Sequence, residues 1–123
     1  MAISDLERHE AYVHLRTMAL KDSIDYLSAD AHRIALDHGF DYRDQSRYYA
    51  LFHSEVSEAF EAFRAGNPLS EKIPGFTQEE EELADVVLRI LGYGHAHQLR
   101  IAEAMFAKNE YNRHRPYKHG KKF

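Results

Sequence analysis

Apolar residues recur along the chain at steps of three and four, which is the spacing of one face of an α-helix. One stripe lies in residues 45–65 and consists of Tyr49, Phe52, Val56, Ala59, Phe60 and Phe63. A second follows Thr77 and consists of Leu83, Val87, Ile90 and Leu91. Prolines are few, and most glycines lie where the periodicity stops. The pattern predicts an all-α fold.

Local start and stop signals divide this pattern into helices. Ser4 with Glu7, and Thr77 with Glu80, form capping-box patterns that start helices. Glycine or proline after a periodic stretch ends them. The predicted helices run from Ser4 towards Lys21, from about Ser23 to Gly39, over 45–65, from Thr77 to a break near Gln98, and from Leu99 to just before Pro116. We expect a bundle of four to five helices.

Length and composition narrow the class of protein. The 123 residues are enough for one domain with its own core, and we treat 1–123 as that domain, with an extra N-terminal helix at 1–22 and a basic tail at 116–123. The absence of cysteine excludes disulfides, thiolate chemistry and cysteine-ligated metals. No signal peptide and no membrane-spanning run is evident. We therefore expect a soluble cytoplasmic protein.

The net charge of −4 is unevenly distributed. Up to Ala107 there are 10 Lys and Arg against 19 Asp and Glu, and from Lys108 onward there are 6 against 1. An acidic body with a basic end fits either of two arrangements. The tail binds a polyanion, or the carboxylates hold cations while the tail holds the phosphates that those cations bridge.

Two carboxylate pairs carry the candidate chemistry. Glu55 and Glu58 lie three residues apart on one predicted helix, and Glu82 and Asp85 repeat the spacing on the next. Residues three apart project on one side of a helix, so each pair can hold one hard cation. Either pair alone is usual on a solvated helix face, but two pairs on consecutive helices can converge across an antiparallel hairpin. All-oxygen ligands favour Mg²⁺, with Mn²⁺ as an alternative.

The sequence lacks the residue patterns of other metal sites, of phosphate-binding loops and of nucleophilic enzymes. No histidine follows a glutamate at the Glu-x-x-His spacing of di-iron bundles, and His95 and His97 are spaced to diverge on a helix rather than to share a zinc ion. Phosphate-binding glycine loops and nucleophile elbows are also missing. We attribute Glu79, Glu80 and Glu81 to the favourable effect of acidic groups at a helix N-terminus.

The predicted last helix presents cationic and amide groups on one face, at Lys108, Asn112 and Arg115. These groups suit phosphate oxygens. The plain alternative is a helix C-terminus enriched in cations that offset its dipole.

Three segments taken in order resemble a known family. They are Leu51 to Arg64 with Glu-x-x-Glu, Glu81 to Ile90 with Glu-x-x-Asp, and Lys108 to Gly120 with its Lys, Asn, Arg-Pro-Tyr pattern. Together they resemble the MazG-like nucleotide pyrophosphohydrolases of the all-α NTP pyrophosphatase superfamily, over about residues 23–123. Several members have two adjacent glutamates at the start of the first motif, where this chain has Ser54.

The resemblance implies Mg²⁺-dependent hydrolysis of a nucleoside triphosphate to the monophosphate and pyrophosphate. It implies that Glu55, Glu58, Glu82 and Asp85 bind the metal and act in catalysis. One of them, or Glu61, would be the general base. The implied phosphate contacts are Lys108, Asn112, Arg115 and Lys118.

The resemblance also implies a homodimer or homotetramer in which helices of neighbouring subunits complete the bundle. For the base pocket the candidates are His32, Tyr49, Phe52 and His53, each of which also suits ordinary packing. Two alternatives stay open: a non-catalytic helical oligomer that binds metal or nucleotide, and a nucleic-acid-binding module that uses the basic tail. The acidic body argues against the second alternative.

Overall fold

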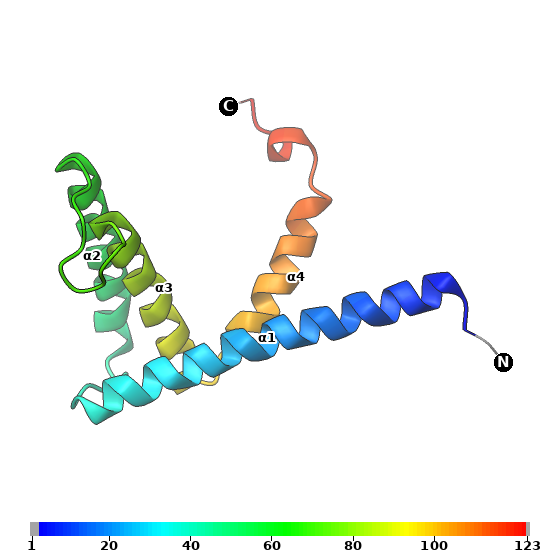
Figure 1. Cartoon of the computed structure of the whole chain (residues 1–123), viewed down its shortest axis with the longest axis horizontal. Helices are drawn as coiled ribbons and strands as arrows, with labels where there is room; N and C mark the ends of the chain where they lie inside the picture. The colour runs from blue at the N-terminus through cyan, green and yellow to red at the C-terminus, as the bar shows by residue number, and fades with distance from the viewer. Residues whose placement is uncertain (1–2, 123) are drawn as a thin grey trace. The chain divides into compact units, whose positions relative to one another are not determined.

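The computed structural model describes residues 3–122, and it is all-α, as the apolar spacing predicts. Figure 1 shows the elements in order. They are α1 (Asp5–Asp37), α2 (Gln45–Arg64), α3 (Gln78–Ala96), α4 (Ile101–Arg113) and a short 3-10 helix (Tyr117–Gly120). Over this described range the chain contains no β-strand, only an isolated bridge between Leu69 and Thr77. Within residues 3–122, no helix has both the length and the apolar character needed to cross a membrane.

The first helix, α1, is 33 residues long and replaces the two helices predicted on either side of Asp22. The predicted start at Ser23 is wrong because the Ser23 hydroxyl donates to the Ala19 carbonyl 3.1 Å away, inside the helix, instead of capping a new one. Lys21 and Asp25 form an ion pair of 2.8 Å across the same turn. Local polar contacts therefore carry the helix through the predicted break.

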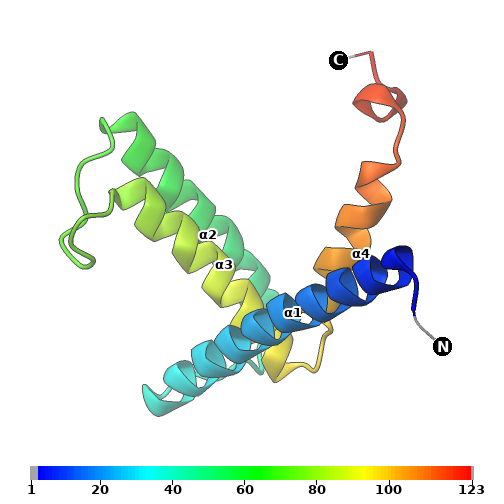
Figure 2. The ribbon, with the colours of Figure 1, turned by 45° about the vertical axis from the view of Figure 1, so that its right-hand side comes forward.

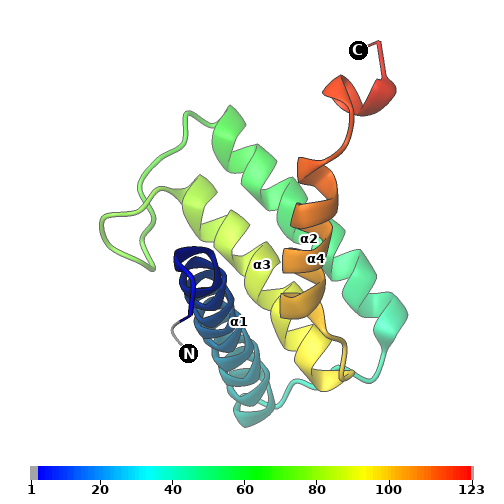
Figure 3. The ribbon, with the colours of Figure 1, turned by 90° about the vertical axis from the view of Figure 1, so that its right-hand side faces the viewer.

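The α2 and α3 helices form an antiparallel hairpin (Figure 2). The Asp44 side chain caps α2 by accepting from the Arg47 amide. Thr77 and Glu80 form the predicted capping box at the start of α3. Figure 3 shows the loop that joins the two helices, and a Ser70 amide to Phe76 carbonyl bond of 2.8 Å helps to close it. These caps fix the register in which α2 faces α3.

The chain divides into two units, Leu27–Leu99 and Met1–Tyr26 with Arg100–Phe123, and each is described by itself. The first has its buried centre at Tyr42, Tyr48 and Tyr93. Partly buried Ala35, Leu51, Phe52 and Ala96 pack around these rings. In the second, Lys21 on α1 lies 3.6 Å from Glu103 on α4.

The apolar stripe of α2 is buried at Ala59 and partly buried at Phe52, and its prediction as a core stripe is wrong at its other four positions in the single chain. Phe60 and Phe63 are 57% and 61% exposed, and Tyr49 and Val56 are also more than half exposed. The buried positions of α2 are Tyr48, Glu55, Ala59 and Ala62. Small alanines let two helices approach closely, whereas phenylalanines would hold them apart. On α3, Leu83 and Val87 are likewise exposed, and Leu91 is buried as predicted.

Gly92 of α3 allows another close approach. A Cβ atom at this position would collide with the Tyr42 hydroxyl and lie 3.2 Å from Tyr42 Cζ and 3.6 Å from Ala31 Cβ. The glycine therefore lets the C-terminal half of α1 and the loop after it pack onto α3.

Candidate functional site

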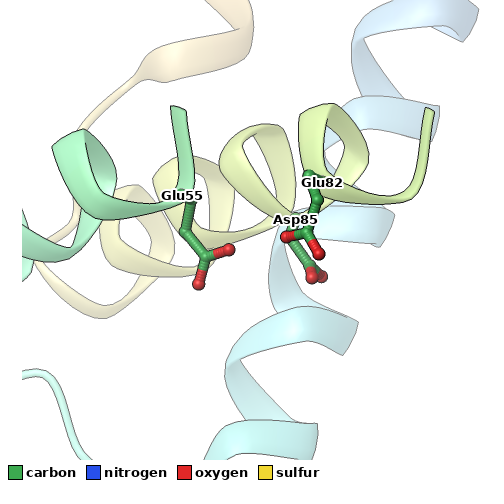
Figure 4. Close-up of side chains that lie close together, drawn as sticks. All are labelled: Glu55, Glu82 and Asp85. Carbon is green, nitrogen blue, oxygen red and sulfur yellow. The ribbon is translucent and has the colours of Figure 1, made fainter. Parts of the chain in front are cut away.

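Three carboxylates meet on the α2–α3 hairpin. One oxygen each from Glu55, Glu82 and Asp85 lies within 4.8 Å of the others. Figure 4 shows Glu55 projecting from one helix and the other two from its neighbour. The predicted convergence of carboxylates across the hairpin is thus observed for three of the four residues.

Glu58 joins this group through Glu82. The pKa of Glu82 is raised to about 7 by burial first, then by its hydrogen bond with Glu58 and by the charges of Glu58, Asp85 and Glu55. In the protonated form the Glu82 carboxyl donates to Glu58. The four carboxylates therefore form one electrostatic unit, called here the acidic cluster.

Burial also raises the pKa of Asp85, and the negative charges of Glu55 and Glu81 act in the same direction. The positive charges of Arg89 and Lys72 oppose that shift. Both raised pKa values have one physical cause, because carboxylates held close together and partly out of water are costly to ionise. A divalent cation among them would remove that cost, and the all-oxygen donor set suits Mg²⁺.

Arg89 is a site residue that the sequence reasoning did not identify. Its Nε atom lies 2.6 Å from an oxygen of Glu55, whose side chain is only 8% exposed. Arg89 follows Asp85 by four residues on α3, which places both on the same face of the helix. That i, i+4 spacing was the available sequence signal.

The acidic run before the cluster is not uniform. Glu80 serves in the capping box, as a helix N-terminus favours. Glu81, however, is buried, accepts a 2.8 Å hydrogen bond from the Ser70 hydroxyl and lies 3.5 Å from Lys72 Nζ. Its role is to tie the loop to α3, so the helix dipole alone does not account for it. Glu61 pairs with Arg64 at 3.1 Å.

A cavity of about 590 Å³ adjoins the acidic cluster. Asp85 and Arg89 form part of the cavity wall, so the cavity borders the acidic cluster at these two residues. Its apolar and aromatic wall consists of Leu27, Ala31, Ile34, Ala35, Phe40, Tyr42, Tyr48, Leu51 and Leu88. Asp30, Asp41, Asp44 and Arg47 supply further charged groups. A largely apolar pocket with a few charged groups at one side is the usual form of a small-molecule site.

The four predicted base-binding residues lie outside this cavity wall. Tyr49 and Phe52 pack edge-on against Tyr93, at ring separations of 5.6 and 5.5 Å. His53 is exposed on α2. The aromatic groups that do line the cavity, Phe40, Tyr42 and Tyr48, lie in and beside the α1–α2 connection.

His32, the remaining candidate, pairs with a histidine of α3. The Nδ1 atoms of His32 and His95 are 2.8 Å apart, so one ring donates to the other. The edge of the pair packs on Tyr42, whose ring centroid is 5.3 Å from that of His32. Burial lowers the pKa of His32, and the charges of His95 and His97 lower it further. This pair links α1 to the hairpin.

The predicted phosphate contacts lie in the other unit, with Lys108 and Asn112 on α4 and Lys118 on the 3-10 helix. The prediction that Arg115 shares a helix face with Lys108 and Asn112 is wrong, because α4 ends at Arg113. Lys108 Nζ lies 4.5 Å from the centroid of the Tyr111 ring, and Arg115 lies 5.8 Å from the same ring. Lys118 lies 5.8 Å from the ring of Tyr117. Lys108 and Asn112 also line a cavity of about 580 Å³ between α4 and Ile24 of α1. The cations are thus presented beside exposed aromatic rings.

Comparison of the chain with protein-family models, with curated proteins and with solved structures gives no match. The resemblance to MazG-like pyrophosphohydrolases therefore stays a prediction.

Proposed function

We propose that the protein is a Mg²⁺-dependent nucleoside triphosphate pyrophosphohydrolase, which uses one water to convert a nucleoside triphosphate to the monophosphate and pyrophosphate. The observation that carries the proposal is the convergence of Glu55, Glu82 and Asp85 beside a cavity of small-molecule size. The order of the three sequence motifs points to the same reaction. A cytoplasmic location belongs to the same proposal.

In this proposal each part of the site has a distinct task. Glu55, Glu82 and Asp85, with Glu58 beside Glu82, hold Mg²⁺. When bound, Mg²⁺ neutralises charge on phosphate oxygens and lowers the pKa of a bound water. The aromatic wall of the cavity packs against the nucleoside and excludes bulk water from it. Lys108, Asn112, Arg115 and Lys118 contribute donors for phosphate oxygens.

We further propose that the protein works as a homo-oligomer. The exposed stripe of α2 supports this, because contiguous apolar surface of this kind usually marks a protein interface.

The decisive experiment measures pyrophosphate release from a panel of ribo- and deoxynucleoside triphosphates with and without Mg²⁺. We expect Mg²⁺-dependent release from at least one nucleotide, and loss of at least a hundredfold in Asp85→Asn, because the altered group is a proposed metal ligand. Glu71→Gln, an exposed carboxylate of the loop, is the control and should keep full activity. No release from any nucleotide would refute the enzyme. Metal binding without turnover would instead support the non-catalytic alternative.

A further inference from the structure

Arg89 occupies a position that the proposed reaction has not yet used. Its Nε atom is 2.6 Å from Glu55, and the Glu55 carboxylate is almost completely withdrawn from water. A buried carboxylate without a partner is strongly destabilising, so this ion pair offsets the cost of burying Glu55. In the protein without metal, Arg89 therefore supplies the positive charge that the acidic cluster needs.

A divalent cation at the cluster would compete for the same oxygen atoms. The ligand atoms of Glu55, Glu82 and Asp85 lie within 4.8 Å of one another, and one oxygen of Glu55 already accepts from Arg89. A cation that neutralises Glu55 removes the reason for the ion pair, and its positive charge repels the guanidinium. The divalent cation and the Arg89 guanidinium therefore compete for Glu55, because each repels the other.

The structure also gives the guanidinium a place to go. The Arg89 side chain is 40% exposed and forms part of the wall of the 590 Å³ cavity, next to Asp85. It can leave Glu55 by side-chain rotation without opening the packed centre of the unit. A free guanidinium there would meet the anionic end of a ligand, for which its planar donor set is well suited.

We propose that Arg89 is a displaceable counterion: it neutralises Glu55 in the absence of metal, gives way to the divalent cation, and then contacts the phosphate of the ligand in the cavity. This inference rests on the proposed function, and it adds a ligand-binding residue that couples the two binding events. Metal binding frees the anion-binding group, so metal and phosphate each strengthen the binding of the other.

The test separates two effects that have opposite signs. Calorimetry at pH 8 measures the affinity for Mn²⁺ alone, and then for the preformed Mn²⁺ complex of a nucleoside triphosphate with a non-hydrolysable α,β bridge. For Arg89→Gln we expect Mn²⁺ alone to bind about tenfold tighter and the complex about tenfold weaker than in the wild type. A residue that merely supports the fold would weaken both.

Arg47→Gln is the matched control, because Arg47 lines the same cavity and its loss removes the same charge. We expect its Mn²⁺ affinity to stay within about twofold of the wild type, since the ion pair with Glu55 is made by Arg89. Arg89→Lys keeps the charge and serves as a second variant in case Arg89→Gln misfolds. Its Mn²⁺ affinity should lie between those of the wild type and Arg89→Gln.

Each contrary result has a definite meaning. If the wild type binds Mn²⁺ and Arg89→Gln binds it equally or more weakly, Arg89 orients Glu55 as a ligand and the displacement is refuted, while the proposed function survives. An unchanged affinity for the nucleotide complex would refute the contact with phosphate. If the wild type binds no Mn²⁺, both the metal site of the proposed function and this inference fail.

Discussion

Four carboxylates crowd one stretch of the α2–α3 hairpin, and Arg89, with a smaller contribution from Lys72, offsets their charge there. The raised pKa values of Glu82 and Asp85 express the cost of that crowding. Groups that are costly to keep together reduce stability, and natural chains keep them where a ligand uses them. We therefore expect the carboxylates of this cluster to lower the stability of the metal-free protein and to be needed for metal binding.

Glu82→Gln tests both expectations. With the metal removed by EDTA at pH 8, the variant should be more stable than the wild type by about 1 kcal/mol, a value kept low because solvent screens a partly exposed group. Mg²⁺ should raise the stability of the wild type, because a ligand that binds only the folded state stabilises it, and should raise that of the variant much less. Urea unfolding with and without Mg²⁺ measures both effects. Glu71→Gln should behave as the wild type, and a variant less stable than the wild type in EDTA would contradict the expected crowding.

The His32–His95 pair predicts a dependence of stability on pH. Its hydrogen bond needs at least one neutral ring, and the pKa of His32 is lowered below 6.5 by burial and by His95 and His97. The unfolded chain therefore binds more protons than the folded chain as the pH falls through 6.5, so stability is complete above that pH and declines below it. Tyr42, the other titratable group that faces His32, stays neutral throughout this range.

Thermal unfolding at pH 7.5 and 5.5 checks this expectation. The Tm of the wild type should fall by about 3 °C more than that of His32→Gln, which lacks the titrating ring. His14→Gln removes an exposed histidine of α1 and should fall as the wild type does. Equal falls in the wild type and His32→Gln would show that the pair does not sense pH.

At the scale of whole elements, Gly92 is a position where Tyr42 of the α1–α2 connection approaches α3 closely. Alanine in place of glycine normally stabilises a helix by about 1 kcal/mol. Here the added Cβ atom would strike Tyr42, so we expect Gly92→Ala to lose about 2 kcal/mol through overpacking. In a Tyr42→Phe background the loss should be smaller, because the hydroxyl that the Cβ meets is gone. A double-mutant cycle by urea unfolding measures this coupling, and its absence would contradict the contact.

The sequence predicted those parts of the hairpin that depend on neighbouring residues. The Thr77–Glu80 capping box and the end of α2 before Gly66 follow from local chemistry. The direction of the α2 stripe does not, because periodicity shows that a helix has an apolar face but not which partner covers it. Arg89 escaped notice for a related reason, since its contact with Glu55 joins two helices and exists only after they pack.

At the scale of the whole chain, the uneven distribution of charge along the sequence corresponds to the division of the structure into two units. The carboxylates of the acidic cluster lie in the Leu27–Leu99 unit, whereas the predicted phosphate contacts lie in the unit that contains α4. In the proposed function the acidic cluster holds the metal and Lys108 contributes a donor for a phosphate oxygen. Variants in the two units should therefore differ in kind: Lys108→Ala should raise the KM for the nucleotide, whereas Asp85→Asn should lower kcat. Steady-state kinetics separates the two, and an unchanged KM in Lys108→Ala would remove that residue from the site.

The α2 stripe gives a prediction for the assembly. Tyr49, Val56, Phe60 and Phe63 stay more than half exposed in one chain, on a strip of α2 beside the buried alanines. Since covering such a surface gains about 25 cal/mol for each Å² removed from water, we expect a second copy to cover it. Sedimentation should show a dimer or tetramer for the wild type, and a smaller species for Phe60→Glu combined with Phe63→Glu, because two buried charges without partners oppose association. Leu69→Glu places a charge on an apolar residue of the loop that is just as exposed, and it should leave the assembly intact. A wild type that sediments as a monomer would mean that the stripe has another partner.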